Sequence, residues 1–156
     1  MATPLPRPVY LAIGYVLTSR PFTRWHRWIY RRTGGRGVLA RALGMDMILV
    51  TARGRRSGEP RTVPLGAIRH GPAWIVIGSN SGKTTEPAWA DNLRADGSVV
   101  VDHRGVCRPH HAHEAGPEEA ETLWPIVIAG YPGYGIYRER TTRPVALFVL
   151  EPVEAV

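Results

Sequence analysis

The stretch that decides the fold is GRRSGEPRTVPL, residues 54–65. It connects two apolar segments that are typical of β-strands, residues 47–53 and 62–70. Its two glycines and first proline predict a tight turn, and three arginines fall within seven residues, 55–61. Guanidinium groups beside exposed backbone N–H groups suit the binding of a polyanion. The alternative is a basic hairpin that is merely solvated.

Short apolar segments separated by turn residues continue on both sides of this stretch. Strands are predicted at residues 47–53, 62–70, 73–79, 98–102, 106–114 and 145–150. Helices are predicted at 9–18, from Pro21 to before Gly34, at 87–95 and from Pro117 onward. The apolar face expected of the last helix consists of Ala120, Leu123, Trp124, Val127 and Ile128. Five or six strands with three or four interspersed helices indicate an α+β fold around a small antiparallel barrel.

The composition limits the classes of protein that fit. At 156 residues the chain is one domain, and its 44% apolar residues suffice for a core. Its formal net charge is +7, so we expect an anionic partner: a nucleic acid, an acidic lipid surface or a polyanionic cofactor. The single cysteine, Cys107, excludes a disulfide framework and fits a cytoplasmic protein. No run reaches the ~20 apolar residues of a transmembrane helix.

The loop GSNSGKT, residues 78–84, follows an apolar strand and resembles a nucleotide-binding P-loop. The P-loop pattern needs four residues between its glycines, and here there are three. Pro87 also interrupts the long helix that would have to begin at the lysine. An NTPase is therefore disfavoured. The loop is interpreted as a polar segment that lines a ligand site, or as a plain connection between a strand and a helix.

Tyr131, Tyr134 and Tyr137 recur every three residues in a segment that also holds three glycines and a proline. On a helical turn the rings would share one side, although so many glycines argue against an ordinary core helix. Phenol groups offer flat apolar area and a proton donor, which suits stacking on a ring and protonation of a reduced product. The alternative is three half-buried tyrosines that plug one end of the barrel.

Three histidines, His110, His111 and His113, raise the question of a metal site. On a strand, His111 and His113 share a face while His110 points away. No acidic or cysteine partner lies at a familiar ligand spacing, so we expect a solvated strand and no metal.

The helix that begins near Pro21 is basic and amphipathic. In a helical projection, one stripe consists of Arg20, Arg24, Arg27 and Arg31. The opposite side consists of Phe22, Trp25 and Ile29. Trp28 and Tyr30 lie at the flanks, and Arg32 falls on the apolar side. This pattern is typical of helices that bind an anionic membrane surface, here through residues 20–32. The alternative is a helix packed on the barrel as a lid over the site, with its arginines in water.

Four motifs occur in order between Met47 and Pro152, over about two-thirds of the chain. They are GRRSGxxRxxPL at 54–65, SNxG at 79–82, PAWxxNLRA at 87–95 and YPxYxxY at 131–137. At these intervals they resemble the deazaflavin-dependent nitroreductase family, whose members use coenzyme F420. The resemblance implies a split β-barrel of the flavin-reductase type, with about six mainly antiparallel strands and peripheral helices. The expected organisation is a helical segment over residues 1–40 and a cofactor-binding barrel over 41–156.

The resemblance also implies roles for individual residues. The arginines of the first motif would bind the anionic part of F420, and Pro64 and Leu65 of the same motif would line the ring. Ser79 and Asn80 would approach the ring or its phosphate side, and Trp89 and Asn92 would back the site. The full cofactor-binding set is Arg55, Arg56, Ser57, Arg61, Val63, Pro64, Leu65, Ser79, Asn80, Gly82, Pro87, Trp89 and Asn92. The set that would shape the acceptor site, orient the acceptor or relay a proton is Tyr131, Tyr134, Tyr137 and Ser79. Departures from relatives at Asn80, Ala90 and Gly66 affect the shape of the pocket, so substrate preference does not carry over.

The function implied is an F420H2-dependent reductase that transfers hydride to a quinone, a nitroaromatic or another conjugated acceptor. FMN is the alternative cofactor, and a protein that only binds or carries F420 or FMN is the alternative function. Nucleic-acid binding, suggested by the basic charge, lacks any recognised motif and is not expected. We expect a cytoplasmic protein that associates peripherally with the membrane, because a lipophilic acceptor would be found there.

Overall fold

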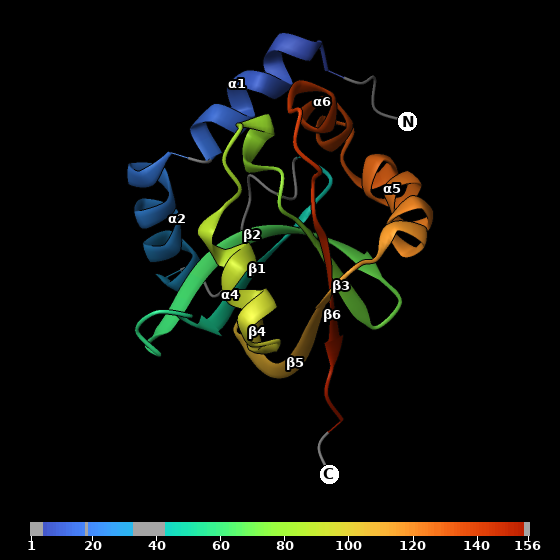
Figure 1. Ribbon diagram of the computed structural model, residues 1–156. Coiled ribbons are helices and arrows are strands. Elements are labelled where there is room, and N and C mark those ends of the chain that lie inside the picture. The colour runs from blue at the N-terminus through green and yellow to red at the C-terminus, as the bar shows by residue number, and fades with distance from the viewer. Residues whose placement is uncertain (1–4, 18, 33–42, 155–156) are drawn as a thin grey trace.

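The computed structural model describes residues 5–17, 19–32 and 43–154. Six strands form a closed antiparallel barrel in the order β1-β2-β3-β6-β5-β4 (Figure 1). Their bounds are Asp46–Arg53 (β1), Pro60–His70 (β2), Ala73–Ile77 (β3), Ser98–His103 (β4), Val106–Glu114 (β5) and Leu147–Pro152 (β6). The predicted α+β barrel is therefore confirmed, and the strand ends differ from the predicted ones by about two residues at most.

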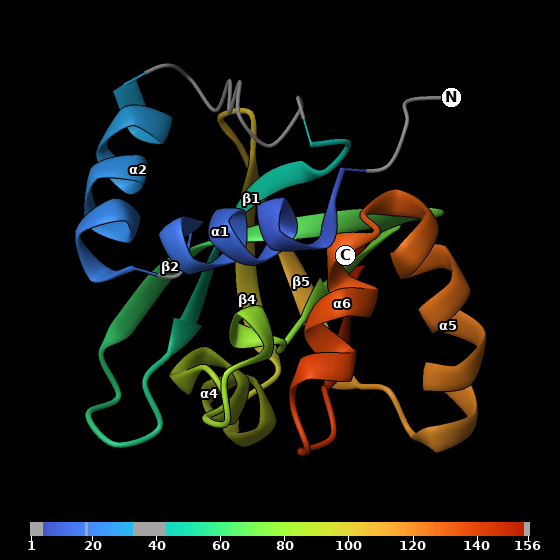
Figure 2. The same ribbon diagram turned by 90° about the horizontal axis from the view of Figure 1, so that it is seen from above.

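The described ranges contain five α-helices and one 3₁₀ turn, where the sequence predicted three or four helices. They are α1 (Arg7–Leu17), α2 (Arg20–Arg32), η1 (Asn80–Gly82), α4 (Ala88–Ala95), α5 (Pro117–Gly130) and α6 (Gly133–Arg140). Figures 1 and 2 show α1 and α6 close together on one side of the barrel, α4 beside its strand ends, and α2 and α5 on opposite flanks.

The turn between β1 and β2 forms as its sequence predicts. Arg53 pairs with Pro60 at the last rung of the hairpin. Inside the turn, the amide of Gly58 donates to the carbonyl of Gly54, and the amide of Gly54 donates to Glu59, both at 2.8 Å. Gly58 has a φ of +72°, a backbone conformation that glycine adopts without strain. The arginines therefore sit on a backbone whose shape is set by its own hydrogen bonds.

The core has two layers because side chains alternate between the faces of each strand. Ile48, Val76 and Phe148 belong to the cluster that fills the barrel, together with Ala90 and Leu93 of α4. A second cluster lies on the other face of β3 and β6 and is covered by α5 and α6. On α5 this cluster includes Leu123, Trp124 and Val127, with Ala120 packed at its edge. Ile128, which was predicted to be buried, is exposed.

Helix α6 was not predicted, because its first residues are rich in glycine. A Cβ atom on Gly133 would lie 2.4 Å from the ring of Tyr131, so the close approach of ring and backbone requires glycine. Burial of Tyr134 and Tyr137 against the second cluster offsets the ~1 kcal/mol that each helical glycine costs. Tertiary packing thus overrides the weak helix propensity of this segment.

Helix α2 is joined to the barrel by Tyr30. The hydroxyl of Tyr30 lies 3.2 Å from the carbonyls of Met47 and Asp102, and it accepts the amide of Arg104 at 3.1 Å. The predicted boundary between residues 40 and 41 lies outside the described residues. Among the helices of the described ranges, none has the length and apolar character that crossing a membrane requires.

Candidate functional site

Two adjoining cavities form the candidate site, and Val63, Leu65 and Trp89 line both of them. The arginine cavity has a volume of about 350 Å³ and the tyrosine cavity about 250 Å³. Predicted residues that line only the arginine cavity are Arg55, Arg56, Ser57, Arg61 and Asn92. Those that line only the tyrosine cavity are Pro64, Ser79, Asn80, Pro87, Tyr131, Tyr134 and Tyr137. The fold therefore brings four separate motifs to one continuous groove.

Arg56 and Arg61 carry the available positive charge of the arginine cavity. Both are exposed, and neither guanidinium has a hydrogen-bond or ion-pair partner within the described ranges. Ser57 lies between them on the turn, where its Oγ accepts the amide of Glu59 at 3.3 Å. Two guanidinium groups with free N–H donors beside a largely apolar lining suit an anionic ligand with an apolar portion.

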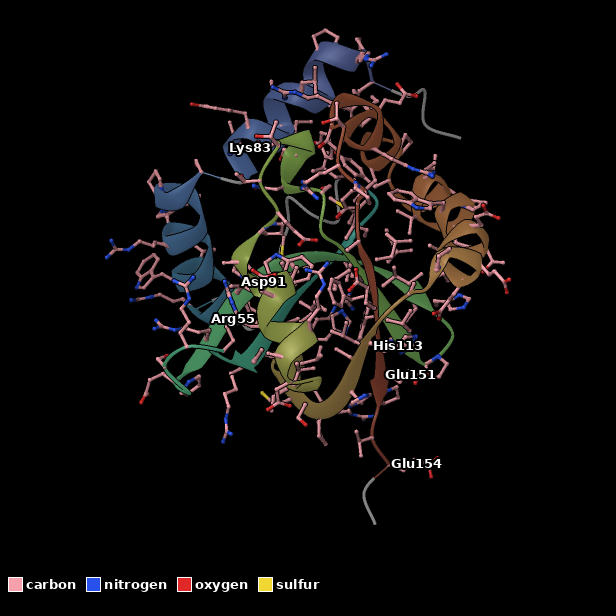
Figure 3. The ribbon with its side chains drawn as sticks, in the orientation of Figure 1. Arg55, Lys83, Asp91, His113, Glu151 and Glu154 are labelled. Carbon is pink, nitrogen blue, oxygen red and sulfur yellow. The ribbon has the colours of Figure 1, made fainter. Side chains whose placement is uncertain are left out.

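Arg55 is engaged differently from its neighbours. Its guanidinium forms an ion pair with Asp91 at 3.0 Å and donates to the carbonyl of Ala88 and to Oδ1 of Asn92. Its amide also donates to Oδ1 of Asn92 at 3.1 Å. Figure 3 shows Arg55 and Asp91 adjacent, between the β1–β2 turn and α4. Arg55 therefore fastens the turn to α4, and Asn92, which is buried, receives both bonds.

The other side of α4 is held by Arg94. Its guanidinium contacts Glu86 at 2.7 Å, Glu114 at 2.6 Å and Asp91 at 3.3 Å. The hydrogen bonds to Glu114 and Glu86 raise the pKa of Arg94. The hydrogen bond between Arg94 and Glu114 also lowers the pKa of Glu114. Trp89 is thus presented to both cavities by a helix that is fixed on two sides.

Arg143 shapes the loop that carries Ser79. One of its terminal nitrogens donates to the carbonyls of Gly78 and Ser79, both at 3.0 Å, and to Thr85 at 3.3 Å. Its Nε donates to the carbonyl of Lys83 at 3.2 Å. A single guanidinium therefore satisfies four carbonyls of one tight loop. Sequence reasoning missed this residue, because an isolated arginine outside any motif gives no signal.

The loop itself is not a P-loop. Asn80 and Ser81 have φ values of 44° and 57°, and Lys83 is extended rather than the first residue of a helix. The Nδ2 of Asn80 donates back to the carbonyl of Thr85 at 2.9 Å. Ser79 is buried against the tyrosine cavity, and its hydroxyl has no hydrogen-bond partner among the described residues. Its Oγ is therefore available to a ligand in that cavity.

The three tyrosines form one buried cluster, with exposed fractions of 2% for Tyr131, 8% for Tyr134 and 3% for Tyr137. They are buried rather than half-buried, and they pack outside the barrel wall rather than in its end. Tyr134 donates to the carbonyl of Gly66 at 3.3 Å. Tyr137 donates to the carbonyl of Tyr10 at 2.7 Å, so its hydroxyl accepts from Tyr131 at 3.3 Å. Burial raises the pKa of all three phenols, which keeps them neutral.

Helix α1 covers the tyrosine cavity, which sequence reasoning did not predict. Gly14 lines the cavity, and its carbonyl accepts the hydroxyl of Ser81 at 2.7 Å. A Cβ atom at Gly14 would lie 2.6 Å from the hydroxyl of Tyr137. The glycine therefore permits a close contact between the helix and the tyrosine cluster. No local pattern in the sequence links segments so far apart.

Two other predictions concern residues that lie away from the groove. Gly82 lines neither cavity and instead packs on α6, where a Cβ atom would lie 2.8 Å from the carbonyl of Tyr137. On β5, His111 and His113 share the outer face as predicted, but His110 is buried and not solvated. His113 contacts Glu119 at 3.0 Å, and no group of three potential metal ligands occurs among the described residues.

Comparisons with known proteins agree with this arrangement. A family model described as F420H(2)-dependent quinone reductase matches residues 22–152. An F420H(2)-dependent quinone reductase of Mycobacterium tuberculosis strain H37Rv is 34% identical over 134 residues, covering 81% of this chain and 87% of that protein. A Mycobacterium bovis protein named for the same activity matches to the same extent. The solved structure of an F420-H2 dependent reductase, FDR-A, is 30% identical with a TM-score of 0.62, covering 67% of this chain and 93% of that one.

These matches confirm the resemblance to F420-dependent reductases, but they do not single out nitro compounds as acceptors. The six-stranded barrel agrees with the fold of the FDR-A structure, and the family model matches most of the chain. This chain belongs to the family of F420H2-dependent quinone reductases.

Proposed function

We propose that this protein reduces quinones with F420H2, and that the arginine and tyrosine cavities hold the two reactants. The main support for this proposal is that the two cavities have three lining residues in common. Val63, Leu65 and Trp89 line both cavities, so a ligand with an anionic part beside Arg56 and Arg61 can extend its apolar part toward the tyrosines. Family membership supports the choice of cofactor and acceptor.

The residues present fit the cofactor. F420 combines a flat deazaflavin ring with a phosphodiester and an oligoglutamate tail, and the groove changes in the same order from apolar to cationic. Arg56, Arg61 and Ser57 would hold the anionic part, while Pro64, Leu65 and Trp89 would flank the ring. When bound, F420H2 supplies the hydride, so the protein has to bind and orient the two reactants and to exclude water from them.

Among the hydroxyls around the tyrosine cavity, that of Ser79 is best suited to contact a ligand. The three phenols already donate within the protein, whereas Ser79 Oγ has no partner in the described ranges. Because burial raises the pKa of the phenols, they act at neutral pH as apolar walls with fixed hydroxyls. We assign Ser79 to orienting the carbonyl oxygen of the quinone or the cofactor ring, and the tyrosines to shaping the pocket.

Turnover of quinones under F420H2 tests this function. Purified protein is mixed anaerobically with F420H2 and either a menaquinone analogue or a nitroaromatic compound, and F420 formation is followed by its absorbance. We expect quinone-dependent oxidation that requires the protein. Binding of F420 without turnover of any acceptor would instead identify a cofactor-binding protein.

We further propose that α1 and α2 dock the protein on an anionic membrane surface. The exposed fractions are 70% for Tyr15, 58% for Trp25 and 56% for Trp28, which are high for aromatic side chains. Arg24 and Arg32 are exposed beside them, and the guanidinium of Arg32 lies 5.2 Å from the ring of Trp28. Exposed aromatic residues mixed with arginines are typical of interfacial helices. The predicted apolar face is modified, because Trp25 faces solvent and Tyr30 packs on the barrel.

The position of this surface supports delivery of a lipophilic acceptor. Gly14 lines the tyrosine cavity while its neighbours Tyr15 and Val16 are exposed, so one helix has contact with both the cavity and the surroundings. The side chains of Arg20, Phe22, Arg27 and Arg31 lie outside the described part of the structure.

Flotation with phosphatidylglycerol vesicles tests the docking. We expect the wild-type protein to float with the vesicles at low salt and to be released at high salt. Replacing both Trp25 and Trp28 by alanine should weaken binding about tenfold or more, because two aromatic contacts are lost. Val106→Ala, at an exposed apolar position of the β4–β5 hairpin, is the control. Equal flotation of all three proteins would exclude α2 as the docking element.

A further inference from the structure

A third cavity, of about 500 Å³, lies at the end of the barrel opposite α4. Figure 2 shows α4 at one end of the barrel and the turn between β4 and β5 at the other. We call this cavity the basic mouth. Its polar lining consists of Arg69, Arg104, Arg108, His103 and His110, and its floor is the buried ring of Trp74.

The basic mouth is built from inward-facing positions of the strands. On β4, Val99 and Val101 fill the barrel and the next inward residue is His103. On β5, Ala112 is followed toward the same end by His110 and Arg108. The inward face therefore changes from apolar to basic within one or two residues. This change places several basic side chains around one cavity, and a bound anion would reduce the electrostatic repulsion between them.

Two of the arginines are poised to donate. The Cζ atom of Arg69 lies over the ring of Trp74, 3.9 Å from its centroid, so a cation–π contact holds this guanidinium at the mouth. Its one other contact in the described structure is a weak bond to the carbonyl of Pro72 at 3.4 Å. The guanidinium of Arg108 has no hydrogen-bond or ion-pair partner among the described residues, whereas its backbone carbonyl lies 3.0 Å from Nδ1 of His110.

The negative charge near these groups is small. Of the described residues that line the basic mouth, none is acidic. Asp46 lies beside it, bonded to His103 at 3.2 Å and 3.9 Å from Arg104. Asp102, which accepts the amide of Gly105 at 2.8 Å, is a second carboxylate at this end of β4. Arg69 and Arg108 have no anionic partner in the described part of the structure.

We propose that the basic mouth binds a small-molecule diphosphate. Guanidinium forks match phosphate oxygens in geometry, and two of them on opposite strands of the mouth suit two adjacent phosphate groups. The cavity is also larger than a single phosphate requires, and Trp74 and Val101 give it an apolar floor. The site is separated from the arginine cavity by the filled interior of the barrel, so it is independent of the proposed cofactor site.

Calorimetric titration with inorganic pyrophosphate tests this site at constant ionic strength. The titration uses a full-length double variant with Arg56→Gln and Arg61→Gln, because those arginines could also bind pyrophosphate. We expect one pyrophosphate to bind per chain. Adding Arg108→Gln should weaken binding about tenfold or more through loss of a charge-assisted hydrogen bond. Since the guanidinium of Arg108 has no partner among the described residues, this variant should keep the melting temperature of its parent.

The matched control is Arg138→Gln in the same double-variant background. Arg138 lies 4.4 Å from the ring of Trp124, and neither residue lines the basic mouth, so this variant tests an arginine–indole pair outside the proposed site. Its affinity should be unchanged, whereas Arg69→Gln should weaken binding as Arg108→Gln does. Absence of pyrophosphate binding at millimolar concentration, or equal affinity with and without Arg108, would overturn the proposal.

Discussion

The hydroxyl of Tyr137 donates to the backbone carbonyl of Tyr10 at 2.7 Å, across 127 residues of sequence. This bond ties α6, which carries part of the tyrosine cluster, to α1, which covers the tyrosine cavity. Ser81 makes the second such bond, to the carbonyl of Gly14. The cover of the site is thus held by two hydroxyl groups that bind the backbone of one helix.

Tyr137→Phe should loosen α1 while leaving the barrel intact. The substitution keeps the ring but removes the hydrogen bond to the carbonyl of Tyr10, and the loss of one hydrogen bond costs about 0.5–1.5 kcal/mol. We expect faster amide hydrogen exchange in residues 7–17 and unchanged exchange in β3 and β6. An equal change in the exchange rates of all segments, or no change in residues 7–17, would mean that the bond does not hold α1.

Arg61→Ala and Arg55→Ala should differ in their effect on F420 binding. The Arg61 guanidinium has no partner in the described structure, so its loss should weaken binding about tenfold or more. Arg55 is already bonded to Asp91, Ala88 and Asn92, so its loss should have a smaller effect on affinity. Fluorescence titration measures both. A larger loss of affinity in Arg55→Ala would show that its guanidinium turns from α4 to the cofactor.

Arg143→Lys should disturb the loop that carries Ser79. An ammonium group cannot reach all the carbonyls of Gly78, Ser79, Lys83 and Thr85 that the guanidinium binds. We expect the melting temperature to fall by about 2–8 °C, the equivalent of roughly 1–2 kcal/mol. A rise in KM for the quinone should accompany this fall. Arg138→Lys is the control. If both variants have the same melting temperature and the same KM for the quinone, Arg143 does not position the loop.

The stability of the protein should decrease in alkaline solution because of the tyrosine cluster. Burial raises the pKa of Tyr131 and Tyr134 above the ordinary value of 10.0, so folding favours the neutral phenol. Their contribution is complete below pH 10 and is lost as the pH rises above it. The free energy of unfolding, measured by urea denaturation, should therefore lose this contribution only above about pH 10. Tyr131→Phe should show a shallower decline, and an identical decline would contradict this assignment.

The sequence predicted the parts of the fold that depend on local signals. Gly58 and Pro60 mark the β1–β2 turn, and Pro87 marks the start of α4, so each was placed within one or two residues. The four motifs also identified most of the groove, because they lie on these locally determined elements. Gly82 is the exception, since its role in packing on α6 depends on a contact that only the fold creates.

The remaining features depend on contacts between distant segments. Helix α6 forms because Tyr134 and Tyr137 are buried, although its glycines disfavour a helix. Arg143 binds a loop about 60 residues away, and Gly14 meets Ser81 across 67 residues. Arg143 and Gly14 belong to no periodic pattern and to no motif. Sequence reasoning therefore located the walls of the site but not its cover or the arginine that fixes its loop.

The most direct test of the account is a titration of the purified protein with F420 and, separately, with FMN, followed by fluorescence. The account predicts saturable binding of F420, weakened about tenfold or more by Arg61→Ala, and much weaker binding of FMN, which lacks the oligoglutamate tail. Tight binding of FMN with no binding of F420 would contradict it. The groove of Arg56, Arg61 and the three tyrosines would then belong to a flavin enzyme rather than to an F420H2-dependent quinone reductase.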